Sequence, residues 1–264
     1  MSGKFISSRD NPLYKELRQL AESSQARRKA ARSLLDGVHL CEAYLQLHGK
    51  PILCAVTEDA QLHGEVAAIL AKCSAMQVNT IVLSSALYRG IRIVEHGIGI
   101  LFLIDTPQPD LPETLTHSAV LLDGVQDPGN LGSILRSAAA AGIASVFCGT
   151  GTAFAWSPKV LRAGMGAHFA LSIYENVDLK SLIQASSVPV IATSSHAQAS
   201  LYELDLRGEV AWLMGHEGQG VSDELMSLVR HTLRIPHAGM MESLNVSASA
   251  AVCFFEQLRQ RQNS

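Results

Sequence analysis

The segment that decides the fold is "RIPHAGMMESLNVSASAA", residues 234–251, which leads from an apolar stretch into the last helix expected in the chain. The small or polar residues before its apolar run are Gly239, Ser243, Asn245 and Ser247. Residues of this kind suit a helix N-cap, and they equally suit a loop shaped around a ligand. The segment alone leaves both interpretations open, so the rest of the chain has to distinguish them.

The composition describes a globular chain of 264 residues, enough for one large domain or two ordinary ones. A hydrophobic content of 47% with 17% charged residues excludes a disordered protein. The five cysteines form no CxxC pair and predict buried, reduced thiols without a disulfide or zinc site. The longest apolar run, "IGILFLI", is too short to span a bilayer. We therefore expect a cytoplasmic protein without a membrane segment or a metal.

Charge is distributed unevenly along the chain. Residues 1–34 hold eight lysines and arginines against three acids, a net charge of +5, whereas the whole chain carries −3. A basic leader on an acidic body suits an arm that contacts phosphates, and Arg27, Arg28 and Lys29 are its densest part. A solvated amphipathic helix explains the same composition, and the sequence leaves this alternative open.

Both halves of the chain alternate strand-like and helix-like segments. In the first half we expect strands over 51–56, 78–83 and 99–104 and helices near 12–21, 38–48, 65–73 and 84–92. This order predicts a compact α/β domain over residues 1–105. The next segment, 106–118, is rich in proline and acids and predicts a linker.

The second half, residues 119–264, alternates more regularly. Strands are expected over 119–125, 144–148, 170–175, 188–193, 210–215 and 231–235, and helices over 130–142, 157–166, 178–186, 222–229 and the C-terminal stretch. Nearly continuous apolar strands between helices predict a parallel sheet covered on both faces. Ligands of such sheets bind at the carboxyl ends of the strands, so the informative loops follow Val125, Thr193, Met214 and Ile235.

Two of these loops carry unusual residues. In "DPGNLGSILRSAAAAG", 127–142, we expect Asn130 to be the helix N-cap. Arg136 is the lone cation of a small-residue helix, and it either pairs with a surface acid or binds a phosphate or carboxylate. In "GHEGQG", 215–220, three glycines surround Glu217, which exceeds what a tight turn requires. The last helix carries an apolar stripe formed by Leu244, Ala248, Ala251, Phe255 and Leu258.

Familiar cofactor and catalytic patterns are missing from the sequence. It contains no GxGxxG, GxxxxGK[ST], HExxH or GxSxG motif. An ordinary dinucleotide site, a P-loop and a zinc protease are therefore excluded.

Taken in order, "DPGNLGSILRSAAAAG", "GHEGQG" and the opening segment closely resemble the three signature motifs of the SpoU (TrmH-like) RNA methyltransferases, members of the SPOUT superfamily. The resemblance spans residues 119–256. More loosely, residues 1–105 resemble the L30e-type substrate-binding domain of many members.

This resemblance implies an α/β fold whose C-terminal parallel-sheet domain, 119–264, holds a deep trefoil knot, preceded by the smaller L30e-like domain and the 106–118 linker. It implies a homodimer and the cofactor S-adenosylmethionine. The implied reaction is methylation of a ribose 2′-hydroxyl in structured RNA, with ribosomal RNA favoured by the L30e-like half. A transfer RNA substrate, and a knotted RNA-binding or assembly factor without catalysis, are the alternatives.

The family's functional positions transfer to matching residues here. The catalytic set implied by the motifs is Arg136, Asn130, Glu217, Ser243 and Asn245. The cofactor-binding set is Thr193, Gly215, Gly218, Ile235, Leu244 and Asn245. We expect Arg136 to hold the target phosphate and polarise the hydroxyl, with Glu217, Ser243 and Asn245 fixing Arg136 and the substrate by hydrogen bonds.

Overall fold

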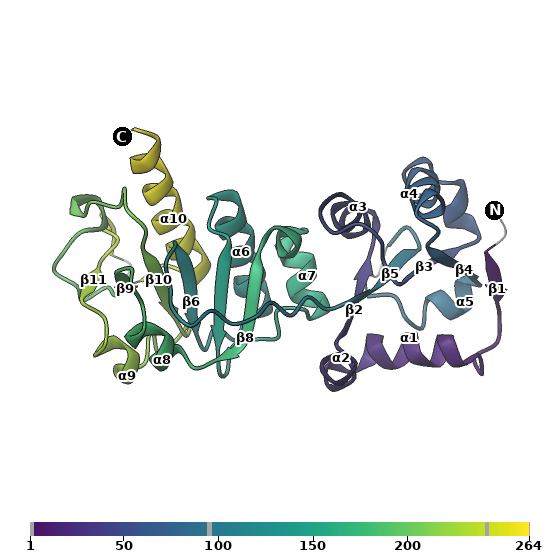
Figure 1. The fold of residues 1–264 in the computed structure, drawn as a ribbon, viewed down its shortest axis with the longest axis horizontal. Helices are drawn as coiled ribbons and strands as arrows, with labels where there is room; N and C mark the ends of the chain where they lie inside the picture. Colours follow the sequence, from purple (N-terminus) through teal and green to yellow (C-terminus); the bar gives the residue numbers. More distant parts are fainter. Residues whose placement is uncertain (1–2, 94–96, 241–242, 264) are drawn as a thin grey trace. The chain divides into compact units, whose positions relative to one another are not determined.

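The computed structural model describes residues 3–93, 97–240 and 243–263, which form two compact units (Figure 1). The first unit consists of the described residues up to Pro107 together with Trp156–Phe169. The second consists of Gln108–Ala155 and the described residues from Ala170 onward. The domain boundaries expected from the sequence, at 105 and 119, stay a prediction.

A five-stranded sheet forms the centre of the first unit, in the order β1-β4-β3-β5-β2. Its strands are β1 (Lys4–Ile6), β2 (Arg32–Asp36), β3 (Leu53–Thr57), β4 (Asn79–Leu83) and β5 (Ile100–Asp105). β1 and β3 run parallel to β4, whereas β5 is antiparallel to both β3 and β2. The three predicted strands are confirmed, and β1 and β2 were not predicted.

The four helices predicted over residues 1–105 are confirmed with different extents, whereas residues 24–30 and 59–62 form helical segments that were not predicted. The helical segments of the first unit are α1 (Pro12–Glu22), α2 (Ser24–Ala30), α3 (Val38–Leu47), the 3-10 turn η1 (Asp59–Leu62), α4 (Gly64–Ala75), α5 (Ser85–Tyr88) and α7 (Pro158–Gly164). Asn11 begins α1 by accepting hydrogen bonds from the N–H groups of Leu13 and Tyr14. Tyr14, Leu17 and Leu20 are buried, so α1, which belongs to the basic leader, is an amphipathic helix packed on the core.

Arg27 is buried in the first unit, contrary to the predicted phosphate-contacting role. Only 6% of its surface is exposed, and its guanidinium donates to the carbonyl oxygens of Leu20 and Ala21 at the end of α1. These carbonyls lack partners within the helix, so the arginine caps them. The prediction is wrong for Arg27, whereas Arg28 and Lys29 lie at the surface.

The second unit contains six strands, all paired in parallel, in the order β11-β9-β10-β6-β7-β8. They are β6 (Ala119–Asp123), β7 (Ser145–Gly149), β8 (Ser172–Val177), β9 (Val190–Thr193), β10 (Ala211–Gly215) and β11 (His231–Leu233). The predicted parallel sheet is confirmed. It forms because its strands are apolar on both faces, and Val120, Leu121, Trp212 and Leu213 are fully buried.

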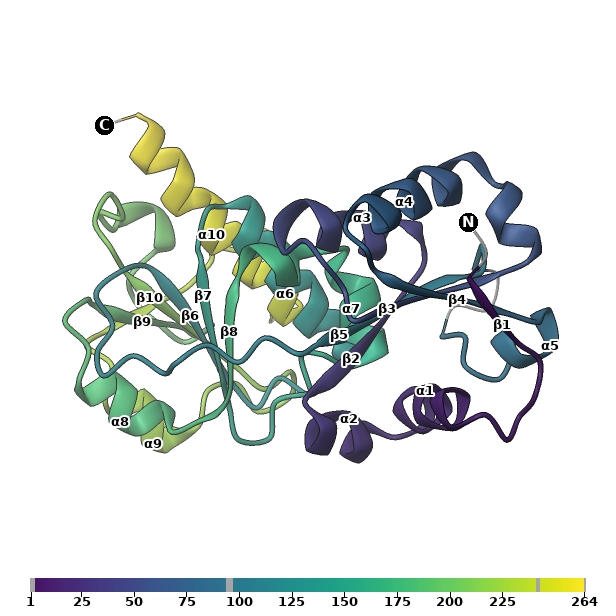
Figure 2. The same ribbon diagram turned by 45° about the vertical axis from the view of Figure 1, so that its right-hand side comes forward.

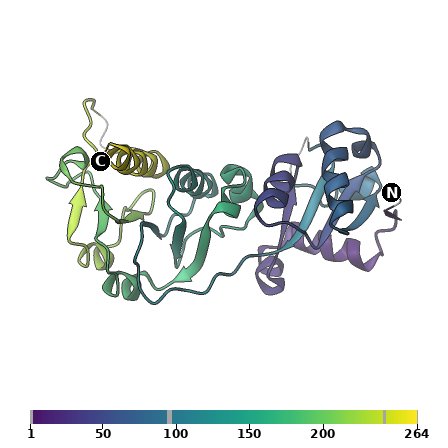
Figure 3. The same cartoon turned by 45° about the horizontal axis from the view of Figure 1, so that its top comes forward.

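Helices cover both faces of this parallel sheet (Figure 2; Figure 3). α6 (Pro128–Ala140) and α10 (Val246–Gln262) lie on one face, and α8 (Leu179–Gln184) and α9 (Asp223–Met226) lie on the other. The second unit also contains the 3-10 turn η3 (Leu201–Glu203), whereas the 3-10 turn η2 (Ala167–Ala170) spans the point in the sequence where the first unit ends and the second resumes. Among the described residues, none of the helices combines the length and apolar character needed to cross a bilayer.

The start of α6 differs from the prediction. Asp127 is the N-cap, and its carboxylate accepts a hydrogen bond of 2.8 Å from the backbone N–H of Asn130. Pro128 occupies the first helical position, where its fixed φ suits a helix and its missing N–H costs nothing. Asn130 therefore lies inside the first turn, and its predicted cap role is wrong.

The interpretation of the segment before the last helix as a helix N-cap is confirmed. Asn245 caps α10 by accepting hydrogen bonds from the N–H groups of Ser247 and Ala248. The buried face of α10 is different from the apolar stripe seen in the sequence. The buried residues include Ala250, Cys253, Phe254 and Gln257. Phe255, from the predicted stripe, is 46% exposed. A buried glutamine, held by the indole N–H of Trp212 at 2.9 Å, explains why hydropathy alone pointed to the wrong face.

Candidate functional site

A cavity of about 530 Å³ opens beyond the carboxyl ends of β9, β10 and β11. This volume lies within the range of small-molecule binding sites, and the location is the one expected for an open parallel sheet. Five of the six predicted cofactor residues line it, namely Thr193, Gly215, Gly218, Ile235 and Leu244. The sixth, Asn245, directly follows Leu244 at the start of α10.

The loop after β10 is folded back tightly on the strand that precedes it. His216 and Gly220 exchange two backbone hydrogen bonds of 2.9 and 2.8 Å. A Cβ at Gly215 would lie 2.1 Å from backbone atoms of Gly220 and Val221, so only glycine fits there. Gly220 adopts φ of +75°, which also favours glycine. Turn geometry thus explains two of the three glycines, whereas Gly218 stands at the loop tip and lines the cavity.

Glu217, at the tip of this loop, binds the start of α6. One carboxylate oxygen, Oε1, accepts from the backbone N–H of Asp127 at 2.9 Å and from the Asn130 side-chain amide at 3.1 Å. The other, Oε2, accepts from the backbone N–H of Gln126 at 3.2 Å. Burial opposes ionisation, but the hydrogen bonds from Asn130, Asp127 and Gln126 outweigh it and lower the pKa of Glu217 to about 2. The side chain is therefore an ionised anchor at neutral pH.

Asn130 also binds Asn245, the residue that caps α10. Its side-chain oxygen accepts a 2.9 Å hydrogen bond from the Asn245 side-chain amide. An ionised carboxylate can only accept, so Asn130 must donate to Glu217 and accept from Asn245. The side-chain oxygen of Asn245 accepts hydrogen bonds from the backbone N–H and the hydroxyl of Ser247 at the start of α10. The orientations of both amides follow from this order, and the chain Glu217–Asn130–Asn245 joins all three motifs.

Arg136 does not take part in this hydrogen-bonded chain. It lies six residues after Asn130 on α6, about 120° away around the helix axis. Its side chain is exposed and, within the described part of the chain, has no hydrogen-bond or ion-pair partner. Within the described part of one chain, Glu217 and Asn245 bind Asn130 and not Arg136, so the expected hydrogen bonds to Arg136 stay a prediction. Ser243 is exposed and lines the cavity.

Three residues that organise the site were not predicted. Asp127 caps α6, and its signal was the Asp–Pro pair at the helix start. Asp123, at the end of β6, accepts a 2.8 Å hydrogen bond from the backbone N–H of Ser222 after the glycine-rich loop. His216 accepts from backbone N–H groups inside that loop. Only the position of Asp123 at a strand's carboxyl end gave a further hint.

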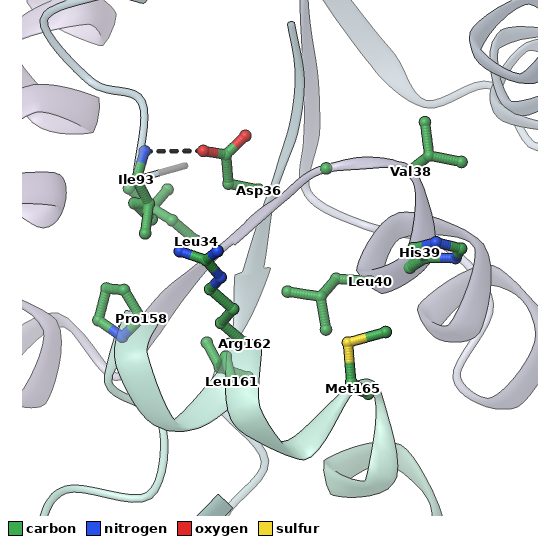
Figure 4. Close-up of a pocket in the computed structure, with 11 residues that line it drawn as sticks. Leu34, Asp36, Val38, His39, Leu40, Ile93, Pro158, Leu161, Arg162 and Met165 are labelled. Carbon is green, nitrogen blue, oxygen red and sulfur yellow. Dashed lines mark hydrogen bonds between the residues drawn. The ribbon is translucent and has the colours of Figure 1, made fainter. Parts of the chain in front are cut away.

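A smaller cavity of about 200 Å³ lies in the first unit and holds none of the predicted site residues (Figure 4). Its walls are mainly apolar, from β2, α3 and α7, as Leu34, Leu40 and Met165 illustrate. Asp36 at its edge accepts hydrogen bonds from the Tyr88 hydroxyl at 2.8 Å and the Ile93 N–H at 2.7 Å. This carboxylate serves the packing of its own unit, so the candidate site is the cavity of the second unit.

Metal chemistry has no support in the described residues, where no group of three or more histidine, cysteine or acidic side chains is arranged to hold an ion. The five cysteines are buried, as expected from the sequence. Burial, and for Cys148 also the nearby Glu175 carboxylate, raises the pKa of the Cys148 and Cys253 thiols.

Comparisons with known proteins identify a family that the chain resembles over most of its length. The family model of the SpoU rRNA methylase family matches residues 117–255. An uncharacterized tRNA/rRNA methyltransferase of Synechocystis is 31% identical, over 97% of this chain and 94% of the relative. A Bacillus subtilis 23S rRNA (guanosine-2′-O)-methyltransferase is 29% identical, over 96% of this chain and 98% of its own. The S-adenosylmethionine-bound structure of a Sinorhizobium meliloti rRNA methyltransferase has a TM-score of 0.83 at 27% identity, covering 97% of each chain. These likenesses support the predicted knotted α/β fold.

Proposed function

This chain belongs to the SpoU rRNA methylase family, and we propose that its catalytic set is Asn130, Glu217, Ser243 and Asn245 together with Arg136. The protein is an RNA 2′-O-ribose methyltransferase that acts on ribosomal RNA with S-adenosylmethionine as its cofactor. The observation that carries the residue assignment is the hydrogen-bonded chain Glu217–Asn130–Asn245 beside the cavity.

The residues around the cavity fit the cofactor. Thr193 ends β9, Gly215 ends β10, and Ile235 and Leu244 belong to the segment between β11 and α10, so backbone groups from several elements converge there. The absence of a side chain at Gly215 lets the backbone of Gly220 and Val221 fold back closely onto the end of β10. When bound, S-adenosylmethionine supplies an electrophilic methyl group.

The chain's own residues then have to place a ribose hydroxyl and assist loss of its proton. Glu217, with its pKa lowered to about 2, accepts three hydrogen bonds and is a poor proton acceptor, so we assign it to orienting Asn130. Arg136, exposed on α6, is assigned to holding the phosphate of the target nucleotide with its planar fork and to polarising the hydroxyl. Alignment of the two reacting groups supplies much of the rate enhancement in reactions of this kind.

We further propose a homodimer that forms through the outer face of α10. Phe255 on this helix is 46% exposed, and Leu244, two residues before the helix begins, is 43% exposed, which leaves an apolar surface for a second copy. Sedimentation of the wild type and of Phe255→Asp tests this, with a monomeric wild type excluding it.

We assign residues 1–105 to RNA binding, 106–118 to a linker and 119–264 to methyl transfer. Exposed cations of the first unit, Arg28 and Lys29 among them, supply the phosphate contacts. A cytoplasmic location follows from a ribosomal substrate and belongs to the same proposal.

The proposal is tested by incubating the purified chain with ribosomal RNA and labelled S-adenosylmethionine, followed by mass-spectrometric mapping of 2′-O-methyl nucleotides. We expect one modified ribose that is absent without the protein. Transfer RNA is the parallel substrate, and its exclusive modification would move the assignment to that class. Binding of RNA without methyl transfer would identify a non-catalytic RNA-binding factor instead.

A further inference from the structure

His216 occupies the first position of the loop that follows β10 and lines the cofactor cavity. Its imidazole Nδ1 lies 2.9 Å from the backbone nitrogen of Gly218 and 3.3 Å from that of Gln219. Both backbone groups are N–H donors, so Nδ1 has to present its lone pair to them. The single proton of the ring therefore resides on Nε2, and the loop fixes the neutral form of the side chain.

This arrangement is the histidine counterpart of an Asx turn. In such a turn the side-chain oxygen of an asparagine accepts from N–H groups two and three residues later in the chain. The Nδ1 of histidine and the Oδ1 of asparagine are both bonded to Cγ, so the imidazole of His216 fills the same place. The backbone pairing of His216 with Gly220 closes the loop, and the Nδ1 contacts satisfy N–H groups at its tip.

We propose that His216 is a positioning residue, which keeps the cofactor loop in its binding conformation only while its imidazole is neutral. The inference rests on the proposed function, since the molecule held by the loop is S-adenosylmethionine. The tip of the loop carries Glu217, whose carboxylate holds Asn130. Loss of the Nδ1 contacts therefore loosens both the cavity wall at Gly218 and the anchor of the hydrogen-bonded chain.

Protonation removes these contacts because a proton on Nδ1 turns an acceptor into a donor that faces two other donors. His216 is partly exposed, so solvent protons reach it. The other titratable side chains around the cavity are His196 after β9, Glu217 in the loop, Asp223 on α9 and His237 after β11. The two acids favour a charged ring, but Glu217 is engaged by Gln126, Asp127 and Asn130. A neutral imidazole completes the loop contacts, whereas a charged one cannot accept from Gly218 and Gln219.

The test is a calorimetric titration of S-adenosylmethionine into the full chain at about pH 8 and about pH 5.5, which brackets histidine titration. For the wild type we expect affinity to fall about tenfold at the lower pH, the value of two modest hydrogen bonds. His216→Asn keeps an acceptor that does not titrate, so its affinity stays within about threefold of the wild-type value measured at high pH, at both pH values. His216→Ala should be about tenfold weaker at both.

Three results would overturn the inference: wild-type affinity that does not change with pH, His216→Ala binding like the wild type at high pH, or His216→Asn losing affinity with pH as the wild type does. The last result would assign the titration to His196 or His237. Failure of the wild type itself to bind S-adenosylmethionine at high pH would instead refute the proposed function. Thermal unfolding of each variant at high pH verifies that the chain is folded.

Discussion

Replacing Asn130 by aspartate tests the hydrogen-bonded chain at its centre. The substitution keeps the size of the side chain and the oxygen that accepts from Asn245. It replaces the amide that donates to Glu217 at 3.1 Å with a second carboxylate oxygen. One donor is lost and two like charges are brought together, while the hydrogen bond from Asn245 is retained.

The magnitude follows from the exposure of the pair. A hydrogen bond to a charged group contributes roughly 1.5–3 kcal/mol, and two unit charges about 3 Å apart in water repel by roughly 1 kcal/mol. Glu217 is exposed, so screening favours the lower end, and we expect a total near 2 kcal/mol. This corresponds to a roughly thirtyfold lower rate of methyl transfer.

Methyl transfer to ribosomal RNA at saturating cofactor is the assay, with thermal unfolding to verify folding. Asn79→Asp, an exposed asparagine on β4, is the matched control for the added charge and should keep the wild-type rate. Asn245→Asp should be milder, because it keeps the α10 cap and places negative charge at a helix N-terminus, although it loses the donor to Asn130. An Asn130→Asp rate within about threefold of the wild-type rate would refute a role of the hydrogen-bonded chain Glu217–Asn130–Asn245 in methyl transfer.

Further predictions concern charged side chains of both units. Arg136→Ala should abolish methyl transfer. It should change S-adenosylmethionine affinity, measured by calorimetry, by only a few fold, because Arg136 is not among the residues that line the cavity. Substantial remaining turnover would remove Arg136 from the catalytic set. Glu217, with its pKa lowered to about 2, stabilises the fold above the ordinary glutamate value near 4.3 and loses this contribution as the pH falls toward 2. The difference in unfolding free energy between the wild type and Glu217→Gln should therefore shrink between about pH 5 and about pH 2, and a constant difference contradicts the assignment. Replacing Arg28 and Lys29 by alanine should weaken RNA binding and reduce its salt dependence, whereas Arg27→Ala should lower the melting temperature, since Arg27 caps α1.

The sequence predicted the parallel sheet of the second unit well because burial on both faces leaves an apolar signature in every strand. It missed β1 and β2, which are only three and five residues long and begin with Lys4 and Arg32. Their identity as strands comes from pairing with β4 and β5, which local composition does not record. The buried face of α10 was mistaken for a related reason, since Gln257 is buried by its hydrogen bond to Trp212.

Motif positions identified which residues belong to the site, but not how they are connected. Glu217 and Asn130 are 87 residues apart, and Asn130 and Asn245 are 115 residues apart. Each asparagine alone has a sufficient local role, Asn245 as a helix cap and Asn130 as a partly exposed residue of a first turn. The connection arises only when the Gly215–Gly220 fold-back directs an ionised carboxylate at the start of α6. Because that carboxylate can only accept, the Asn130 amide must donate to it, and the Asn130 oxygen must accept from the Asn245 amide. The charge of Glu217 therefore determines the orientation of both amides, including that of the residue that caps α10.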